Sequence, residues 1–153
     1  MTLARRALLL LAFAATGAWA APGPYDEAAD AKAQVQAALA DAQQANVPVL
    51  VVFGANWCPD CRVLDMAFKD GQSAPLIQQH FRVVKVDVGR FDRNTDLAER
   101  YGVPLKKGIP AVAVLGAGGK VLYTTKSGEL ADARAMGDKG IYEFFTKVVA
   151  QAK

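Results

Sequence analysis

The stretch that decides the fold runs from residue 49 to residue 61 and reads VLVVFGANWCPDC. Its first five residues, Val49 to Phe53, form a continuous apolar run of strand length, which is typical of a central strand buried on both faces. Gly54 to Trp57 then turn the chain. From Cys58 to Phe68 the apolar residues follow helical spacing. The stretch therefore predicts a buried strand that leads directly into a helix with a cysteine pair at its start.

On both sides of this stretch, helical and extended patterns alternate. Helical spacing predicts helices over Asp26–Gln44, Ser73–His80, Thr95–Tyr101 and Ile141–Ala152. Runs rich in β-branched residues predict strands over Phe81–Val88, Ala111–Leu115 and Val121–Thr125, the last two as a hairpin. A strand–helix–strand order gives a parallel pair with a right-handed crossover, and the hairpin adds antiparallel strands. We expect an α/β fold, with a mixed four-stranded sheet and helices on both faces.

The first twenty residues have the pattern of a secretory signal peptide. Arg5 and Arg6 form the positive start, Ala7–Ala15 is a short apolar run, and small residues precede the cleavage position. A retained membrane anchor is the alternative, but the run is short for a span of ~30 Å. The sequence therefore predicts cleavage near Ala20, one domain over residues 21–153, and a periplasmic or otherwise secreted location.

Composition excludes several classes of protein. The chain has 153 residues, 52% of them hydrophobic and 22% charged, which is typical of a globular protein of about one domain. The net charge of +3 includes Arg5 and Arg6, so the mature chain is close to neutral. We therefore expect neither nucleic acid nor an anionic membrane surface as a partner.

Cys58 and Cys61 are the only cysteines of the chain. A disulfide-linked scaffold would spread several pairs along the sequence, whereas one close pair in an exported protein points to chemistry. A disulfide needs Cα atoms about 4.4–6.8 Å apart, and residues three apart in a helical turn meet that condition. The helix N-terminus favours a thiolate at Cys58, so we expect Cys58 to be the nucleophile and Cys61 the resolving thiol.

Three other uses of the two cysteines compete with a redox role. A structural disulfide that closes so short a loop contributes little entropic stabilisation. Zinc needs four ligands, and this chain offers the two cysteines and a lone His80. Incidental thiols would tend to be oxidised outside the cytoplasm. A redox pair is the interpretation that the pattern favours.

With these residues the sequence resembles the thioredoxin superfamily, and among its members the bacterial periplasmic thiol–disulfide interchange proteins. The resemblance rests on the strand 49–53, the motif Trp57 to Cys61, and Gly108-Ile109-Pro110 before a strand. It implies a thioredoxin-like fold, a redox-active Cys58–Cys61 disulfide with no other cofactor and no metal, and exported protein thiols and disulfides as substrates.

The resemblance also implies roles for residues around the pair. Pro110 would be cis and lie against the cysteines, leaving the backbone of Ile109 to pair with an extended substrate; a trans turn proline is the alternative. Trp57 and Pro59 would flank the reactive sulfur, although a core aromatic is the other interpretation of Trp57. Lys85 matches a family lysine near the pair, with a solvated strand lysine as the alternative.

Two departures from the family concern the buried strand acid and the length of one segment. The buried acid that assists the resolving cysteine falls at Val52 here, which leaves Asp60 as a candidate; an exposed helix-start residue is the other interpretation. The Asp60 charge would raise the pKa of the Cys58 thiol and so favour a reducing pair. The segment Ser127–Gly140 is longer than usual in the family, and we expect it either to set specificity or to be a surface insertion.

The sequence therefore predicts a protein-disulfide reductase or isomerase. A disulfide-forming oxidant is one alternative, and a peptide-binding module or chaperone that uses Ile109 and Pro110 is another. A reductant outside the cytoplasm must be re-reduced, which implies a membrane thiol-electron transporter as a partner.

Overall fold

The computed structural model describes residues 23–152, so the predicted signal peptide and its cleavage position lie outside the described residues. Four strands form one sheet: β1 (Val49–Gly54), β2 (Arg82–Asp87), β3 (Ala111–Leu115) and β4 (Val121–Thr124). Their order is β2-β1-β3-β4. β1 and β2 are parallel, whereas β3 runs antiparallel to both β1 and β4. This is the predicted mixed four-stranded sheet.

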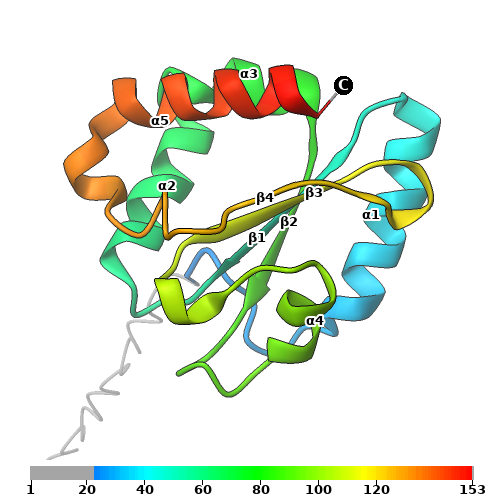
Figure 1. The fold of residues 1–153 in the computed structure, drawn as a ribbon, viewed down its shortest axis with the longest axis horizontal. Coiled ribbons are helices and arrows are strands. Elements are labelled where there is room, and N and C mark those ends of the chain that lie inside the picture. The colour runs from blue at the N-terminus through cyan, green and yellow to red at the C-terminus, as the bar shows by residue number, and fades with distance from the viewer. Residues whose placement is uncertain (1–22, 153) are drawn as a thin grey trace, which may run out of the picture.

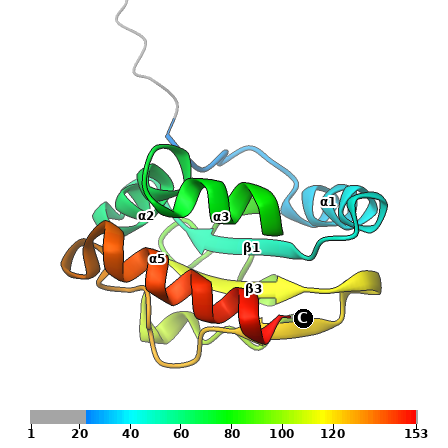
Figure 2. The ribbon, with the colours of Figure 1, turned by 90° about the horizontal axis from the view of Figure 1, so that it is seen from above.

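Helices cover both faces of the sheet (Figure 1). One face carries α1 (Ala31–Ala45) and α4 (Thr95–Arg100), and the other carries α2 (Pro59–Lys69), α3 (Ser73–His80) and α5 (Ala133–Gln151). Figure 2 shows the second group from above, and its three helices contact one another. Among residues 23–152, no helix is both long and apolar enough to cross a membrane. The thioredoxin-like arrangement predicted from the sequence is confirmed.

β1 lies at the centre of two hydrophobic cores. Val49, Val51 and Phe53 pack with α1 and α4, whereas Leu50 and Val52 pack with the other three helices. All six residues of the strand are buried. A strand with apolar neighbours on both faces has no need of alternating polar residues, which explains the unbroken apolar run. The end of this strand is therefore held rigidly, and the cysteine motif follows it directly.

Helix α1 begins five residues later than its spacing predicts. The Asp30 side chain accepts a hydrogen bond from the Ala33 amide at 3.0 Å, so Asp30 is the N-cap and Ala31 the first helical residue. At the other end Asn46 adopts the left-handed conformation, with φ 54°, which stops the helix. Residues 26–30 form turns instead of helix, which frees the segment before α1 to reach the active-site loop.

Helix α5 begins at Ala133, not at the predicted Ile141. Gly137, with φ 64°, breaks its helical geometry and hides the first turn from an analysis of periodicity. Beyond that break, Asp138 accepts hydrogen bonds from the Gln72 amide at 3.1 and 3.0 Å. The second half of Ser127–Gly140 is therefore part of a packed helix and not a loop insertion.

Candidate active site

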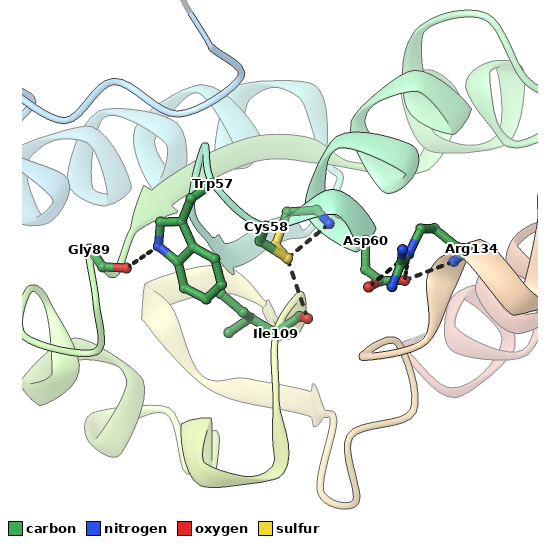
Figure 3. Close-up of a disulfide and its surroundings, with 7 residues drawn as sticks. Trp57, Cys58, Asp60, Gly89, Ile109 and Arg134 are labelled. Carbon is green, nitrogen blue, oxygen red and sulfur yellow. Dashed lines mark hydrogen bonds and ion pairs between the residues drawn. A yellow bond between two sulfur atoms is a disulfide. The ribbon is translucent and has the colours of Figure 1, made fainter.

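The two cysteines form a disulfide at the start of α2, with Cα atoms 5.2 Å apart. Cys58 is the N-cap, and its Sγ accepts a hydrogen bond from the Cys61 amide at 3.2 Å (Figure 3). Pro59 occupies the first helical position, where the missing N–H has no helical partner to lose. The Cys61 side chain is fully buried. The helix N-terminus therefore favours a thiolate at Cys58 once the bond is reduced.

The Ile109–Pro110 peptide bond is cis, as predicted from the resemblance. The Ile109 carbonyl oxygen lies 3.6 Å from Cys58 Sγ, and Figure 3 shows it facing the sulfur. A sulfur in a disulfide has no hydrogen to donate, so this is a contact in the oxidised form. After reduction, the Cys58 thiol can donate a hydrogen bond to that carbonyl, which favours the thiol over the thiolate. Ile109 thus opposes the effect of the helix terminus.

Asp60 is paired with a residue that sequence analysis did not select. Its carboxylate accepts hydrogen bonds from the Arg134 amide at 2.9 Å and from Arg134 Nε at 3.2 Å, and Figure 3 shows the two side chains pointing toward one another. Burial acts to raise the pKa of Asp60, but the hydrogen bonds and charge of Arg134 outweigh it and lower that pKa.

This ion pair changes the expected role of Asp60. The guanidinium of Arg134 balances the carboxylate charge, so the expected repulsion of the Cys58 thiolate is largely cancelled. A carboxylate with a lowered pKa is also a weak proton acceptor, which disfavours the proton-transfer role. The pair joins the start of α2 to the start of α5, and the Ser127–Gly140 segment therefore reaches the redox motif through Arg134.

Trp57 lies on the surface beside the disulfide. It is 40% exposed, so it is not a core aromatic. Its Nε1 donates a hydrogen bond to the Gly89 carbonyl at 2.8 Å, and its ring meets Phe91 edge-on at 6.1 Å. The Arg90 guanidinium lies 4.7 Å from the centre of the same ring. Trp57 and Phe91 together form an exposed aromatic surface next to the reactive sulfur.

Lys85 forms an ion pair with Asp65, one helical turn after Cys61. It lies on β2 opposite Val52, where the family's strand acid would lie. Burial lowers the pKa of Lys85. The buried acid on this side of the sheet therefore comes from helix α2, since Asp65 is 8% exposed. The spacing of four residues from Cys61 was the signal for Asp65 that sequence analysis did not use.

The geometry defines a class of protein. A cysteine pair at a helix N-terminus, a buried resolving sulfur and a cis-proline opposite the nucleophile form a thiol–disulfide oxidoreductase site whose redox group is the disulfide itself. Within residues 23–152, no group of three or more His, Cys, Asp and Glu side chains is placed to hold a metal ion.

Comparison with known proteins places the chain within this class. The family model described as thioredoxin-like matches residues 30–117, more than half of the chain, and the protein belongs to that family. The solved structure of a disulphide isomerase from Xylella fastidiosa is 56% identical, with a TM-score of 0.81, over 84% of this chain and 98% of that one.

Curated relatives are more distant. Thiol:disulfide interchange protein DsbD 1 of Pseudomonas aeruginosa is 29% identical over 107 residues, which are 69% of this chain but 16% of the relative. Thioredoxin 1 of Nostoc is 33% identical over 76 residues, which are 50% of this chain and 64% of the relative. The chain thus spans only a minor part of the first relative and just under two thirds of the second.

Proposed function

We propose that this protein is an extracytoplasmic reductase or isomerase of disulfides in exported proteins, with residues 21–153 as its mature domain. The observation that carries the direction of the reaction is the 3.6 Å contact between the Ile109 carbonyl oxygen and Cys58 Sγ. A carbonyl at that position stabilises the Cys58 thiol relative to the thiolate. Strong oxidants depend on a stabilised thiolate, so this contact supports a pair on the reducing side.

The catalytic cycle follows from the positions of the two sulfurs. The Cys58 thiolate attacks one sulfur of a substrate disulfide, that S–S bond breaks, and the other substrate sulfur leaves as a thiolate. The Cys61 thiolate then attacks Cys58 Sγ, releases the second substrate sulfur and forms the Cys58–Cys61 disulfide. The substrate gains two electrons and the protein loses two. If the first released thiolate attacks a different substrate disulfide instead, the outcome is isomerisation.

The other groups near the nucleophile act on the thiolate in both directions. The Cys61 amide is a donor to Cys58 Sγ, and it stabilises the thiolate. Neither Pro59 nor Asp60 adds a positive charge, and Arg134 is engaged with Asp60. The helix N-terminus and the Cys61 amide are therefore opposed by the Ile109 carbonyl, and no histidine beside the sulfur adds to the stabilisation of the thiolate.

Substrates and electron supply follow from the proposed location. The signal-peptide pattern of residues 1–20 supports export, and in an oxidising compartment a reduced cysteine pair needs a source of electrons. A membrane thiol-electron transporter fits that need. The similar proteins from Xylella and Pseudomonas, a disulphide isomerase and a thiol:disulfide interchange protein, support substrates of the same chemical kind.

Redox equilibration tests the proposed direction. Purified protein is equilibrated with glutathione buffers of graded ratio, trapped with acid, alkylated and weighed by mass spectrometry. We expect a reduction potential between about −180 and −270 mV, the range of isomerases and thioredoxins. A potential near about −120 mV, typical of strong oxidants, would overturn the proposal.

Fractionation of the native host tests the location. The protein recovered from the periplasmic fraction should begin near residue 21 when its N-terminus is sequenced. Recovery of a chain that retains the predicted signal peptide in the cytoplasmic fraction would contradict export. A variant that lacks residues 1–20 is the matched control. It should remain in the cytoplasm, and the purified variant should keep its redox activity.

A further inference from the structure

Tyr25 is a buried tyrosine in the short segment that precedes α1. The side chain of Asn56, in the loop just before the redox motif, is hydrogen-bonded to both backbone groups of Tyr25. The Tyr25 amide donates to Asn56 Oδ1 at 2.9 Å, and Asn56 Nδ2 donates to the Tyr25 carbonyl at 2.8 Å. Tyr25 as a whole is 3% exposed. The segment before α1 is therefore fastened to the active-site loop, with the tyrosine ring directed inward.

The Tyr25 hydroxyl and the resolving sulfur converge above the same backbone atom. A Cβ built on Gly54, the last residue of β1, would overlap the Tyr25 hydroxyl and would lie 3.0 Å from Cys61 Sγ. The Tyr25 hydroxyl and Cys61 Sγ are thus neighbours across Gly54, although they are not hydrogen-bonded while the disulfide is closed. Both groups therefore border the space beside the Gly54 Cα, and a side chain at Gly54 would collide with the tyrosine. The hydrogen bonds between Tyr25 and other described residues are at its backbone, not at its hydroxyl.

Burial of the ring, together with a nearby carboxylate, keeps the Tyr25 hydroxyl protonated. Burial raises the pKa of Tyr25, and the nearby carboxylate of Asp87 raises it further. Asp87 is the register partner of Gly54 on β2, and Glu27 and Arg93 are the other charged groups that act on it. The Tyr25 hydroxyl is therefore a permanent donor at the pH of any biological compartment.

We propose that the Tyr25 hydroxyl donates a hydrogen bond to the sulfur of Cys61 when the disulfide is open, and so stabilises the Cys61 thiolate. This inference rests on the redox function proposed above. It supplies a group for the resolving cysteine in a chain with Val52 at the position of the family's strand acid. Asp65, on the next turn of α2, is engaged with Lys85 and Lys69.

The step served by Tyr25 is the resolution of the mixed disulfide. Cys61 loses its proton to solvent, and the resulting thiolate attacks Cys58 Sγ. The bond between Cys58 and the substrate sulfur breaks, and that sulfur leaves as a thiolate. Tyr25 keeps its own proton throughout. In the reverse direction the same hydrogen bond stabilises Cys61 as the leaving group when a reductant attacks Cys58.

A chromogenic aryl disulfide separates the two steps. The reduced protein releases one arylthiolate when Cys58 attacks and a second when Cys61 resolves the adduct, so each cysteine has its own kinetic phase. In Tyr25→Phe, which keeps the ring, we expect the second phase to slow about tenfold near neutral pH, because a hydrogen bond to a charged group is lost. When the rate of this second phase is plotted against pH, its midpoint should move to higher pH. The first phase should stay within about twofold, since Cys58 is not the partner of Tyr25.

Control variants distinguish chemistry from packing. Tyr101→Phe removes the hydroxyl of another buried tyrosine, one that lines a hollow with Gln43 and Gly119 instead of the redox pair, and both phases should be unchanged. Asn56→Ala should slow the second phase in the same direction as Tyr25→Phe, because it loosens the segment that carries the tyrosine.

The outcomes are distinguishable from failure of the proposed function. If the unaltered protein releases only one arylthiolate, Cys61 does not resolve the adduct and the redox function itself fails. If it releases two and Tyr25→Phe resolves at the same rate with the same pH midpoint, only the role of Tyr25 is overturned. Equal slowing of both phases in Tyr25→Phe would also overturn it, since a general disturbance of the site would then explain the result.

Discussion

Asp60, between the two cysteines, is held by Arg134, which lies 74 residues further along the chain. Both the backbone amide and the guanidinium of Arg134 donate hydrogen bonds to the Asp60 carboxylate. It fixes the beginning of α5 against the beginning of α2. A charge that would otherwise repel the Cys58 thiolate is thereby neutralised by the protein itself.

Removing Arg134 should therefore affect the nucleophile. In Arg134→Ala the Asp60 carboxylate loses its counter-charge, so we expect the pKa of the Cys58 thiol to rise and the reduction potential to become more negative. The free energy of unfolding should fall by about 1 kcal/mol, because the arginine side chain is well exposed. Thiolate absorbance in the ultraviolet measures the first effect and urea unfolding the second. Lys139→Ala, an exposed cation on the same helix, is the control and should change neither.

The same ion pair predicts a dependence of stability on acid. The pKa of Asp60 is lower in the folded protein than its ordinary value of 3.8, so the pair contributes its full stabilisation above that value. The contribution is lost as the pH falls through the lowered folded pKa. In Asp60→Asn, the free energy of unfolding should therefore fall less as the pH is lowered. Unfolding curves between about pH 2 and pH 6 measure it, and parallel curves for the two proteins would contradict the account.

Asp65 should be important for stability because Lys85 is half-buried beside it. Asp65→Asn leaves the Lys85 ammonium without its counter-charge, and we expect a loss of about 1–3 kcal/mol in the free energy of unfolding. Lys69 also contacts Asp65 at 2.9 Å but is exposed, so Lys69→Ala should cost less than about 0.5 kcal/mol. A double-mutant cycle between Asp65 and Lys85 that gives no coupling energy would refute the pairing.

Trp57 should contribute to substrate binding more than to stability. In Trp57→Ala we expect KM for a folded protein disulfide to rise about tenfold, because exposed aromatic residues at an interface contribute strongly to binding. The rate with a small aryl disulfide should change much less, since such a reagent makes few contacts outside the sulfurs. Val121→Ala, at an exposed hydrophobic residue on β4, is the matched control. Equal losses with both substrates would indicate a disturbed redox pair instead.

Local patterns in the sequence identified most of the fold. The buried run of β1, the cysteine helix and the β3–β4 hairpin each have a short-range signal, and each was found where it was predicted. The start of α5 was missed because Gly137 interrupts the helical period. The first turn assigned to α1 was wrong because the side chain of Asp30 caps the helix at a later residue.

The supporting groups of the site were harder to predict. Trp57, the cysteine pair and Pro110 belong to a contiguous or characteristic motif. Arg134 reaches the site through its contact with Asp60, 74 residues away in the sequence. Tyr25 reaches it through backbone hydrogen bonds to Asn56, 31 residues away. Hydrophobic periodicity reports local structure and not contacts between residues far apart in the sequence, so only the folded chain reveals these two contacts.

Covalent trapping tests the central claim most directly. The Cys61→Ser variant is reduced, mixed with a protein that carries an accessible disulfide, quenched and weighed intact. We predict a stable mixed disulfide through Cys58, because no resolving thiol remains. We predict no adduct with Cys58→Ser, because Cys61 has no exposed surface, whereas Cys58 at the helix N-cap keeps 3%. If Cys61→Ser forms no adduct, or if Cys58→Ser forms one as readily, Cys58 is not the nucleophile and the account is wrong.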